Sequence, residues 1–285
     1  MTIAEIHGKL SPDRPKGAHE RMEDLLTSDV FSTMKYVGWE KGFLSWLLEA
    51  EAVPIIPPPR PISDYLKKSI IDIEYSFWPE LANKREPDVA ILLCFDSEDY
   101  LLVLIEAKYF SGTSNWEGDL DTDQYGRTGN QIVDQVIGLD DMSNEDLLKK
   151  WFSGTSHPLN RDKGVQKIHL FITMHNSLPS PEYKPLMNYL KKQRSRHLEV
   201  ECYWLSWLKL AKLLENHRRK PDKGLNAILS DLCKLLQYKD LVPFDGFKID
   251  PWQGQKCTYT FWNETWWDQQ AIEINNYQSF WNGGK

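Results

Sequence analysis

The fold is decided by residues 87–109, which read PDVAILLCFDSEDYLLVLIEAKY. Val89 to Phe95 is a continuous apolar run, a polar turn of four residues follows, and Tyr100 to Tyr109 is a second apolar run. Two such runs joined by a short polar turn predict a hairpin of two buried strands. We take Phe95 to face Tyr100 across the turn.

The hairpin brings two acids and a lysine together. In this register Asp88 lies opposite Ala107. Side chains alternate between the two faces of a strand, so Glu106 and Lys108 point the same way and flank the position opposite Asp88. The pattern therefore predicts one site at the open end of the hairpin.

This set of residues suits magnesium-dependent cleavage of phosphodiester bonds. Asp88 and Glu106 supply hard oxygen ligands for Mg²⁺ or Mn²⁺, and the carbonyl of Ala107 can add a third protein oxygen. The metal would polarise a phosphate oxygen and activate a water, while Lys108 would orient that water and offset charge in the transition state. We expect Lys108→Ala to leave folding nearly intact and to lower cleavage about a hundredfold.

At these residues the chain resembles the PD-(D/E)xK nuclease superfamily, which has the restriction-endonuclease-like fold. Pro87 and Asp88 match the first half of the motif, and Glu106, Ala107 and Lys108 match the second. The resemblance implies a nuclease that acts on nucleic acid, with DNA as the expected substrate. It also implies a setting such as prokaryotic restriction, repair or anti-phage defence.

The stretch from Ala18 to Phe31 resembles the opening helix in which many members place an extra acidic metal or water ligand. At 100° per residue, Glu23 falls on the edge of the apolar stripe made by Leu26 and Val30. Glu23 is therefore our candidate for that ligand. The alternative is a solvated acidic face of a surface helix.

A glutamine follows the lysine strand in many superfamily members, and Gln131 occupies the matching place. The resemblance implies that Gln131 reaches the attacking water or a phosphate. Gln135 lies one helical turn further on. The chain departs from the superfamily at Asn130, usually an aspartate, and at Asp134, often a basic residue. Surface amides on an amphipathic helix are the alternative for each glutamine.

Strand-like runs alternate with helical patterns along the rest of the chain, which predicts an α/β fold with a mixed sheet flanked by helices. This order matches the restriction-endonuclease-like core. We assign residues 1–245 to a nuclease-like domain. The further expected elements are strands at Ser69 to Trp78, Val165 to Met174 and Leu198 to Leu205, and a helix near Tyr183 to Gln193.

Residues 246–285 form an aromatic-rich C-terminal extension that includes Trp252, Trp262, Trp266 and Trp267. Aromatic side chains can stack on unpaired bases, but that mode normally accompanies a basic groove, and this segment has few cations. We therefore expect the extension to pack against the domain, a second copy of the chain or a partner protein.

Composition is that of an ordinary globular protein of 285 residues, with 41% hydrophobic and 26% charged residues. No apolar run approaches the ~18 residues needed to cross a membrane, so we expect a cytoplasmic protein without a membrane segment. The four cysteines are far apart and are expected to be reduced, without a zinc site.

The net charge of −7 does not favour nonspecific binding to phosphates. Basic residues do cluster locally, for example at Lys149 and Lys150, and at Arg161, Lys163 and Lys167. The acidic balance and the aromatic extension leave a second function open. This is a nuclease-fold protein that serves as a binding or assembly module with little or no catalytic activity.

Overall fold

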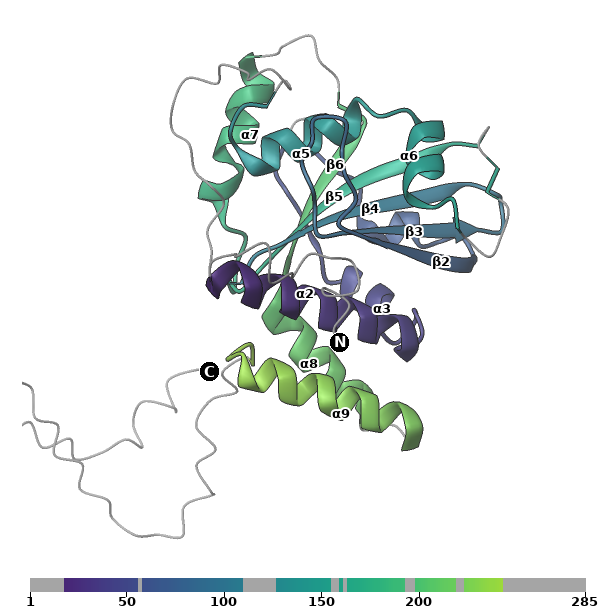
Figure 1. The fold of residues 1–285 in the computed structure, drawn as a ribbon, viewed down its shortest axis with the longest axis vertical. Helices are drawn as coiled ribbons and strands as arrows, with labels where there is room; N and C mark the ends of the chain where they lie inside the picture. Colours follow the sequence, from purple (N-terminus) through teal and green to yellow (C-terminus); the bar gives the residue numbers. More distant parts are fainter. Residues whose placement is uncertain are drawn as a thin grey trace, which may run out of the picture. The chain divides into compact units, whose positions relative to one another are not determined.

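The computed structural model describes residues 18–55, 58–109, 127–154, 159–160, 163–192, 198–218 and 223–242. In these ranges the protein has an α/β fold, in which helices cover both faces of a mixed sheet of six strands (Figure 1). The predicted α/β class, with a mixed sheet flanked by helices, is therefore confirmed. The predicted extension at 246–285, and most of the loop between the lysine strand and Gln131, lie outside the described residues.

Three neighbouring strands at the centre of the sheet, β4, β5 and β6, run parallel to one another. The pairs β2–β3, β3–β4 and β1–β6 are antiparallel. Every strand predicted from the sequence is present, with ends that differ by at most two residues. In sheet order the strands are β1 (Glu51–Ala52), β6 (Val200–Ser206), β5 (Val165–Thr173), β4 (Tyr100–Ala107), β3 (Val89–Phe95) and β2 (Ile70–Phe77).

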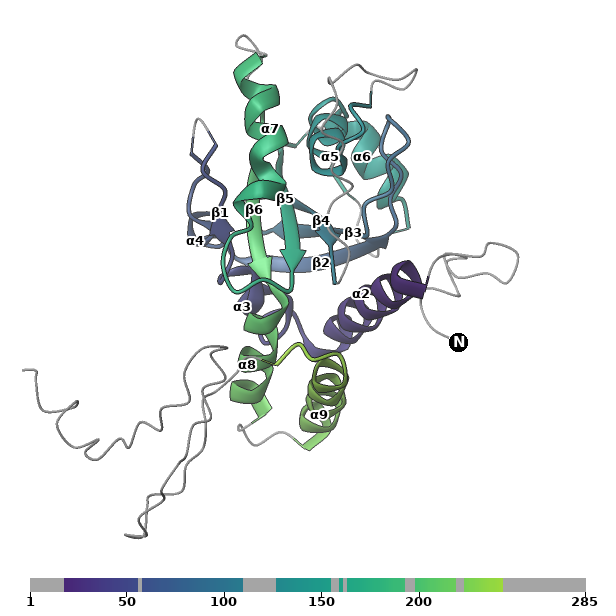
Figure 2. The same cartoon turned by 90° about the vertical axis from the view of Figure 1, so that its left-hand side faces the viewer.

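The helices form two layers, which are seen on opposite sides of the sheet in Figure 2. One layer contains α2 (Ala18–Val37), α3 (Phe43–Leu47), α8 (Trp207–Arg218) and α9 (Lys223–Tyr238), with the short α4 (Ile62–Tyr65) packed into the same core. The other layer contains α5 (Gln131–Asp140), α6 (Asn144–Trp151) and α7 (Ser180–Lys192).

Strands β3 and β4 are buried along their whole length because helices cover both of their faces. Ile91 and Ile105 face the layer that contains α2, whereas Leu92 and Leu104 face the layer that contains α5. The same alternation sends Glu106 to the α5 face and Ala107 to the α2 face.

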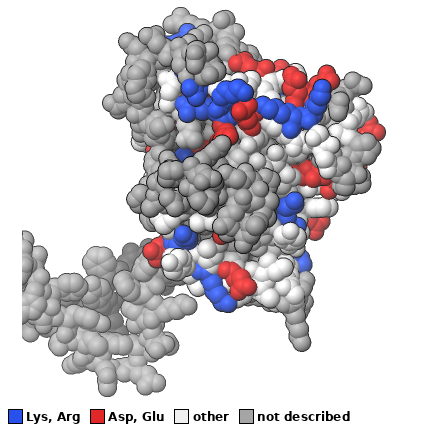
Figure 3. Space-filling model, in the orientation of Figure 1, with Lys and Arg blue, Asp and Glu red and all other residues white. Residues whose placement is uncertain are grey.

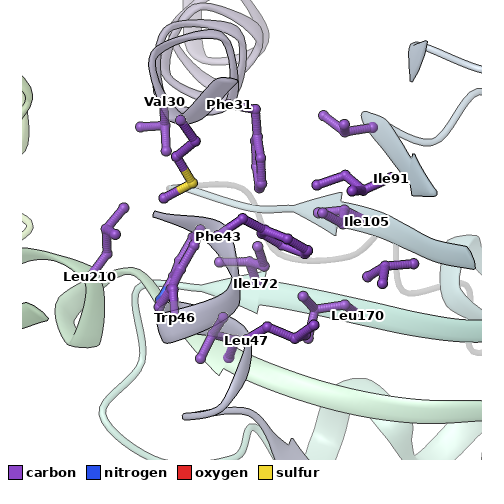
Figure 4. Packing of buried hydrophobic residues seen from close by; sticks show 14 of the residues in the cluster. Val30, Phe31, Phe43, Trp46, Leu47, Ile91, Ile105, Leu170, Ile172 and Leu210 are labelled. Carbon is purple, nitrogen blue, oxygen red and sulfur yellow. The ribbon is translucent and has the colours of Figure 1, made fainter. Parts of the chain in front are cut away.

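The core on the α2 face fixes the position of that helix over the sheet (Figure 4). Phe31 of α2 packs against Trp46, with ring centroids 5.9 Å apart, and Trp46 packs against Trp207 at 5.2 Å. The indole nitrogen of Trp46 also donates to the carbonyl of Ser206 at 3.2 Å. These contacts join the second half of α2 to α3 and to the start of α8.

The register of the β3–β4 hairpin differs by one residue from the prediction. Cys94, not Phe95, lies opposite Tyr100, and the backbone N–H of Phe95 donates to the carbonyl of Asp99 at 3.1 Å. The turn is therefore shorter than expected, and Glu98 within it has a φ of 62°. Short hairpin loops often close with a residue in this left-handed region, usually glycine, so a glutamate there gives no signal in the sequence.

Two general predictions can be compared with the described ranges. Cys94 and Cys202 are free and buried, as expected, and Cys233 is also buried, whereas Cys257 lies outside these ranges. No helix in the described part of the chain is both long and apolar enough to cross a membrane. Contacts divide the chain into residues 1–243 and 244–285, and all described residues belong to the first unit.

Candidate functional site

Asp88 flanks Glu106 at the open end of the hairpin. The backbone N–H of Asp88 donates to the carbonyl of Ile105 at 3.0 Å, and its carboxylate Oδ2 accepts from the N–H of Ala107 at 2.8 Å. The predicted position opposite Ala107 was wrong by one residue, because the turn is shorter than assumed. The true register places Asp88 closer to Glu106 than the prediction did. Burial, and then the negative charge of Glu106, raise the pKa of Asp88 well above its usual range.

Glu106 is buried, with 1% of its surface exposed, and both of its oxygens are hydrogen-bonded. Its Oε1 accepts from Gln131 Nε2 at 2.5 Å and lies 2.6 Å from Lys108 Nζ. Its Oε2 accepts from Gln135 Nε2 at 2.5 Å. Residues four apart on a helix share a face, so both glutamines of α5 reach the same carboxylate. The structure thus makes Gln135 part of the site together with Gln131.

The start of α5 is fixed by Asn130 and Asp134, the two positions where the chain departs from the superfamily pattern. The side chain of Asn130 caps the helix by accepting from the N–H of Val133 at 3.1 Å. Asp134 accepts from the N–H and hydroxyl of Thr128 at 2.6 and 2.8 Å. It also accepts from two nitrogens of Arg85, at 3.0 and 2.5 Å. Asp134 therefore fastens α5 to the segment that leads into Asp88.

Lys108 lies between two buried carboxylates. Its Nζ is 2.8 Å from Glu23 Oε1 and 2.6 Å from Glu106 Oε1. The second oxygen of Glu23 accepts from the N–H of Tyr109 at 3.1 Å, and the indole nitrogen of Trp207 donates to the carbonyl of Lys108 at 3.1 Å. The structure brings Glu23 into the site, where its carboxylate binds the lysine. Glu23 is 8% exposed, so it does not belong to a solvated helix face.

The charges in the site are unbalanced. Burial alone would lower the pKa of Lys108, but attraction by Glu106, Asp88 and Glu23 raises it above the ordinary value. Lys108 therefore stays charged, and it is one cation beside three acids. A site with this composition favours an additional cation when all three acids are ionised.

The residues that could hold a metal are Asp88, Glu106 and the carbonyl of Ala107, as predicted from the motif. Over the described ranges there is no group of three or more His, Cys, Asp or Glu side chains arranged to hold a metal. Mg²⁺ needs fewer protein ligands than that, because it keeps several waters and commonly binds one or two carboxylates together with substrate phosphates. Asp88 and Glu106 fit such a site, because the negative charge of Glu106 acts on the carboxyl of Asp88 in the folded protein.

The sequence did not single out His169 as part of the site. In the structure its Nε2 lies 2.9 Å from Oε1 of Gln135. His169 is fully buried in β5, and burial lowers its pKa to about 3. It lies beside Leu104 of β4, on the face covered by α5. Only the pairing of β5 with β4 reveals this neighbourhood, and no spacing in the sequence encodes that pairing.

Comparisons of the chain with protein-family models, with curated proteins and with solved structures gave no match in any of the three. Its function is therefore inferred from the geometry and chemistry of the site.

Proposed function

We propose that the chain is a Mg²⁺-dependent nuclease of the PD-(D/E)xK superfamily that hydrolyses phosphodiester bonds, with DNA as its substrate. The observation that carries this proposal is the contact of Lys108 with Glu106 at 2.6 Å, in a site that Asp88 completes. Buried acids around a lysine are costly to keep in a protein that needs only a scaffold.

The order of the elements supports the restriction-endonuclease-like fold. Helix α2 precedes three antiparallel strands, β2, β3 and β4, and α5 then leads to β5, which runs parallel to β4. The motif residues lie where β3 begins and where β4 ends. This is the arrangement that the resemblance implies for the superfamily core.

The charge of the site supports a divalent cation as cofactor. The raised pKa of Asp88 means that the metal-free site tends to retain a proton there, and a bound cation would take over the role of that proton. Asp88, Glu106 and the carbonyl of Ala107 would hold Mg²⁺, or Mn²⁺ in its place. When bound, the metal would polarise a phosphate oxygen and lower the pKa of a coordinated water.

The chain's own residues would position the reacting groups and stabilise charge. Lys108 keeps its ammonium group at the edge of the site, where it would offset the negative charge that develops on the phosphate. Glu23 holds that ammonium in place at 2.8 Å. Gln131 is partly exposed, so its amide can donate to a phosphate oxygen or a water as well as to Glu106.

A basic surface over the region of α5 and α6 supports contacts with a phosphate backbone. Figure 3 shows a band of Lys and Arg side chains over the region of α5 and α6. Lys150 of α6 contacts Glu80 at 3.3 Å, and Lys84 contacts the same side chain at 2.8 Å, so an acid offsets part of the positive charge of these lysines. Lys167, expected in a basic cluster, is instead buried and donates to the carbonyl of Met142 at 2.6 Å. We therefore expect nonspecific binding to nucleic acid to be weak.

The proposal is tested by cleavage of single- and double-stranded DNA and RNA in the presence of Mg²⁺ or Mn²⁺. We expect DNA cleavage that EDTA abolishes and that Glu106→Gln lowers about a hundredfold or more. Glu51→Gln is the matched control, because Glu51 is an exposed acid paired with Lys209 away from the site. If folded wild type binds nucleic acid but cleaves none of these substrates, the chain is a binding module and the nuclease proposal is wrong.

A further inference from the structure

A chain of hydrogen bonds runs from Glu106 through Gln135 to His169. Gln135 Nε2 donates to Glu106 Oε2 at 2.5 Å, and Gln135 Oε1 lies 2.9 Å from His169 Nε2. All three side chains are buried, with at most 1% of each exposed. They come from β4, α5 and β5, so the chain joins three elements at the proposed active site.

The chemistry of these groups fixes the direction of each hydrogen bond. A carboxylate only accepts, so the atom of Gln135 that faces Glu106 must be its NH₂ group. The carbonyl oxygen of Gln135 then faces His169, which has to donate from Nε2. A neutral histidine has one N–H, so Nδ1 carries no proton. His169 Nδ1 has no hydrogen-bond partner among the described residues, so no contact there requires a proton on Nδ1.

We propose that His169 is a positioning residue for Glu106. Its Nε2–H keeps the amide of Gln135 in the one orientation that presents NH₂ to Glu106. Without that donor, a half turn of the amide would bring two oxygens together and push Glu106 away from its present rotamer. This inference rests on the proposed function, because it assumes that Glu106 holds the metal.

A positioning role for His169 predicts a larger effect on metal affinity than simple packing in the core does. Partners that orient a metal-binding side chain typically contribute about 10–100-fold to metal affinity or activity. A packed histidine would affect folding but would have no specific effect on Glu106. The two roles are distinguished by whether a side-chain amide at position 169 restores the metal affinity.

The test compares two substitutions of His169. His169→Gln keeps an NH₂ group within reach of the place of Nε2, whereas His169→Leu fills the space without a donor. We expect His169→Leu to weaken Mn²⁺ binding about 10–100-fold in calorimetric titrations, and His169→Gln to restore most of the loss. His175→Leu is the control, because His175 contacts Thr173 and does not contact Gln135 or Glu106 in the described structure. Equal Mn²⁺ affinity in His169→Leu and wild type would overturn the inference.

A second measurement is independent of metal and of catalysis. In ¹⁵N-labelled, metal-free wild type, the nitrogen resonances of His169 should report a neutral ring with its proton on Nε2 from pH 5 to pH 8. A proton on Nδ1 would overturn the inference even if the enzyme is active. If wild type shows the Nε2–H form but neither binds Mn²⁺ nor cleaves nucleic acid, the proposed function fails and so does any role of His169 in it. If wild type cleaves nucleic acid but the Mn²⁺ affinities of the His169 variants or the nitrogen resonances of His169 differ from those expected, the proposed function holds and the positioning role of His169 is wrong.

Discussion

Removing the charge of Lys108 is the perturbation that the structure makes most informative. Lys108→Met keeps most of the side-chain volume and removes the ammonium group that lies 2.8 Å from Glu23 and 2.6 Å from Glu106. The motif alone led us to expect that a Lys108 variant would fold nearly as well as wild type. The structure changes that expectation, because Lys108 is the charged partner of two buried carboxylates.

The expected loss follows from burial. The side chains of Lys108, Glu23 and Glu106 are 12%, 11% and 2% exposed, so water screens these charges poorly. Breaking a buried ion pair by removal of one partner costs about 3–5 kcal/mol, and we expect about 3 because Lys108 keeps some contact with water. The pKa of Lys108 is raised in the folded state, so its stabilising effect is fully present below the ordinary lysine pKa and is lost only as pH rises through the raised value.

Urea unfolding at pH 7.5 in EDTA measures this loss. The matched control is Lys67→Met, because Lys67 pairs with Asp64 at 2.7 Å but the two side chains are 74% and 42% exposed. An exposed pair of this kind contributes less than about 1 kcal/mol. If Lys108→Met loses no more stability than Lys67→Met, the carboxylates do not depend on Lys108 and the electrostatic description of the site is wrong.

Three further outcomes are expected. In EDTA the wild type should lose stability as pH rises from 3.8 through the raised pKa of Asp88, because the folded state retains a proton that the unfolded chain releases. Asp88→Asn should abolish that loss in urea titrations across pH, so an equal slope in both proteins would contradict the raised pKa. Glu23→Gln should slow single-turnover cleavage, and added Mg²⁺ should not restore the rate, because Glu23 binds Lys108; full recovery would make Glu23 a metal ligand. Gly138→Ala should cost about 1–3 kcal/mol in thermal unfolding, since its Cβ would lie 2.8 Å from the amide nitrogen of Asn83, and an unchanged midpoint would refute that close packing.

Local patterns in the sequence predicted the strands that carry the candidate site. The two apolar runs predicted β3 and β4, and the motif at their ends named Asp88, Glu106 and Lys108. Spacing along helices was equally informative, since the apolar stripe of α2 predicted that Glu23 faces inward. The four-residue separation of Gln131 and Gln135 puts both on one face of α5, but that this face meets Glu106 is known only from the structure.

What the sequence missed depends on contacts between distant residues or on unusual backbone. Glu98 adopts a left-handed conformation without the usual glycine, and this moved the hairpin register by one residue. Lys167 resembles a surface cation in sequence, yet it is buried against the carbonyl of Met142. His169 enters the site only because β5 pairs with β4, and the pairing of distant strands has no local signal. Strand β1 is two residues long, too short to give a pattern.

The central claim is that Asp88 and Glu106 together hold a divalent metal. Crystals grown with Mn²⁺, measured near the manganese absorption edge, would test this directly. We predict an anomalous peak about 2.0–2.6 Å from carboxylate oxygens of both residues, absent in crystals of Asp88→Asn. A wild-type structure with no peak between these carboxylates, at Mn²⁺ concentrations that support cleavage, would contradict the claim.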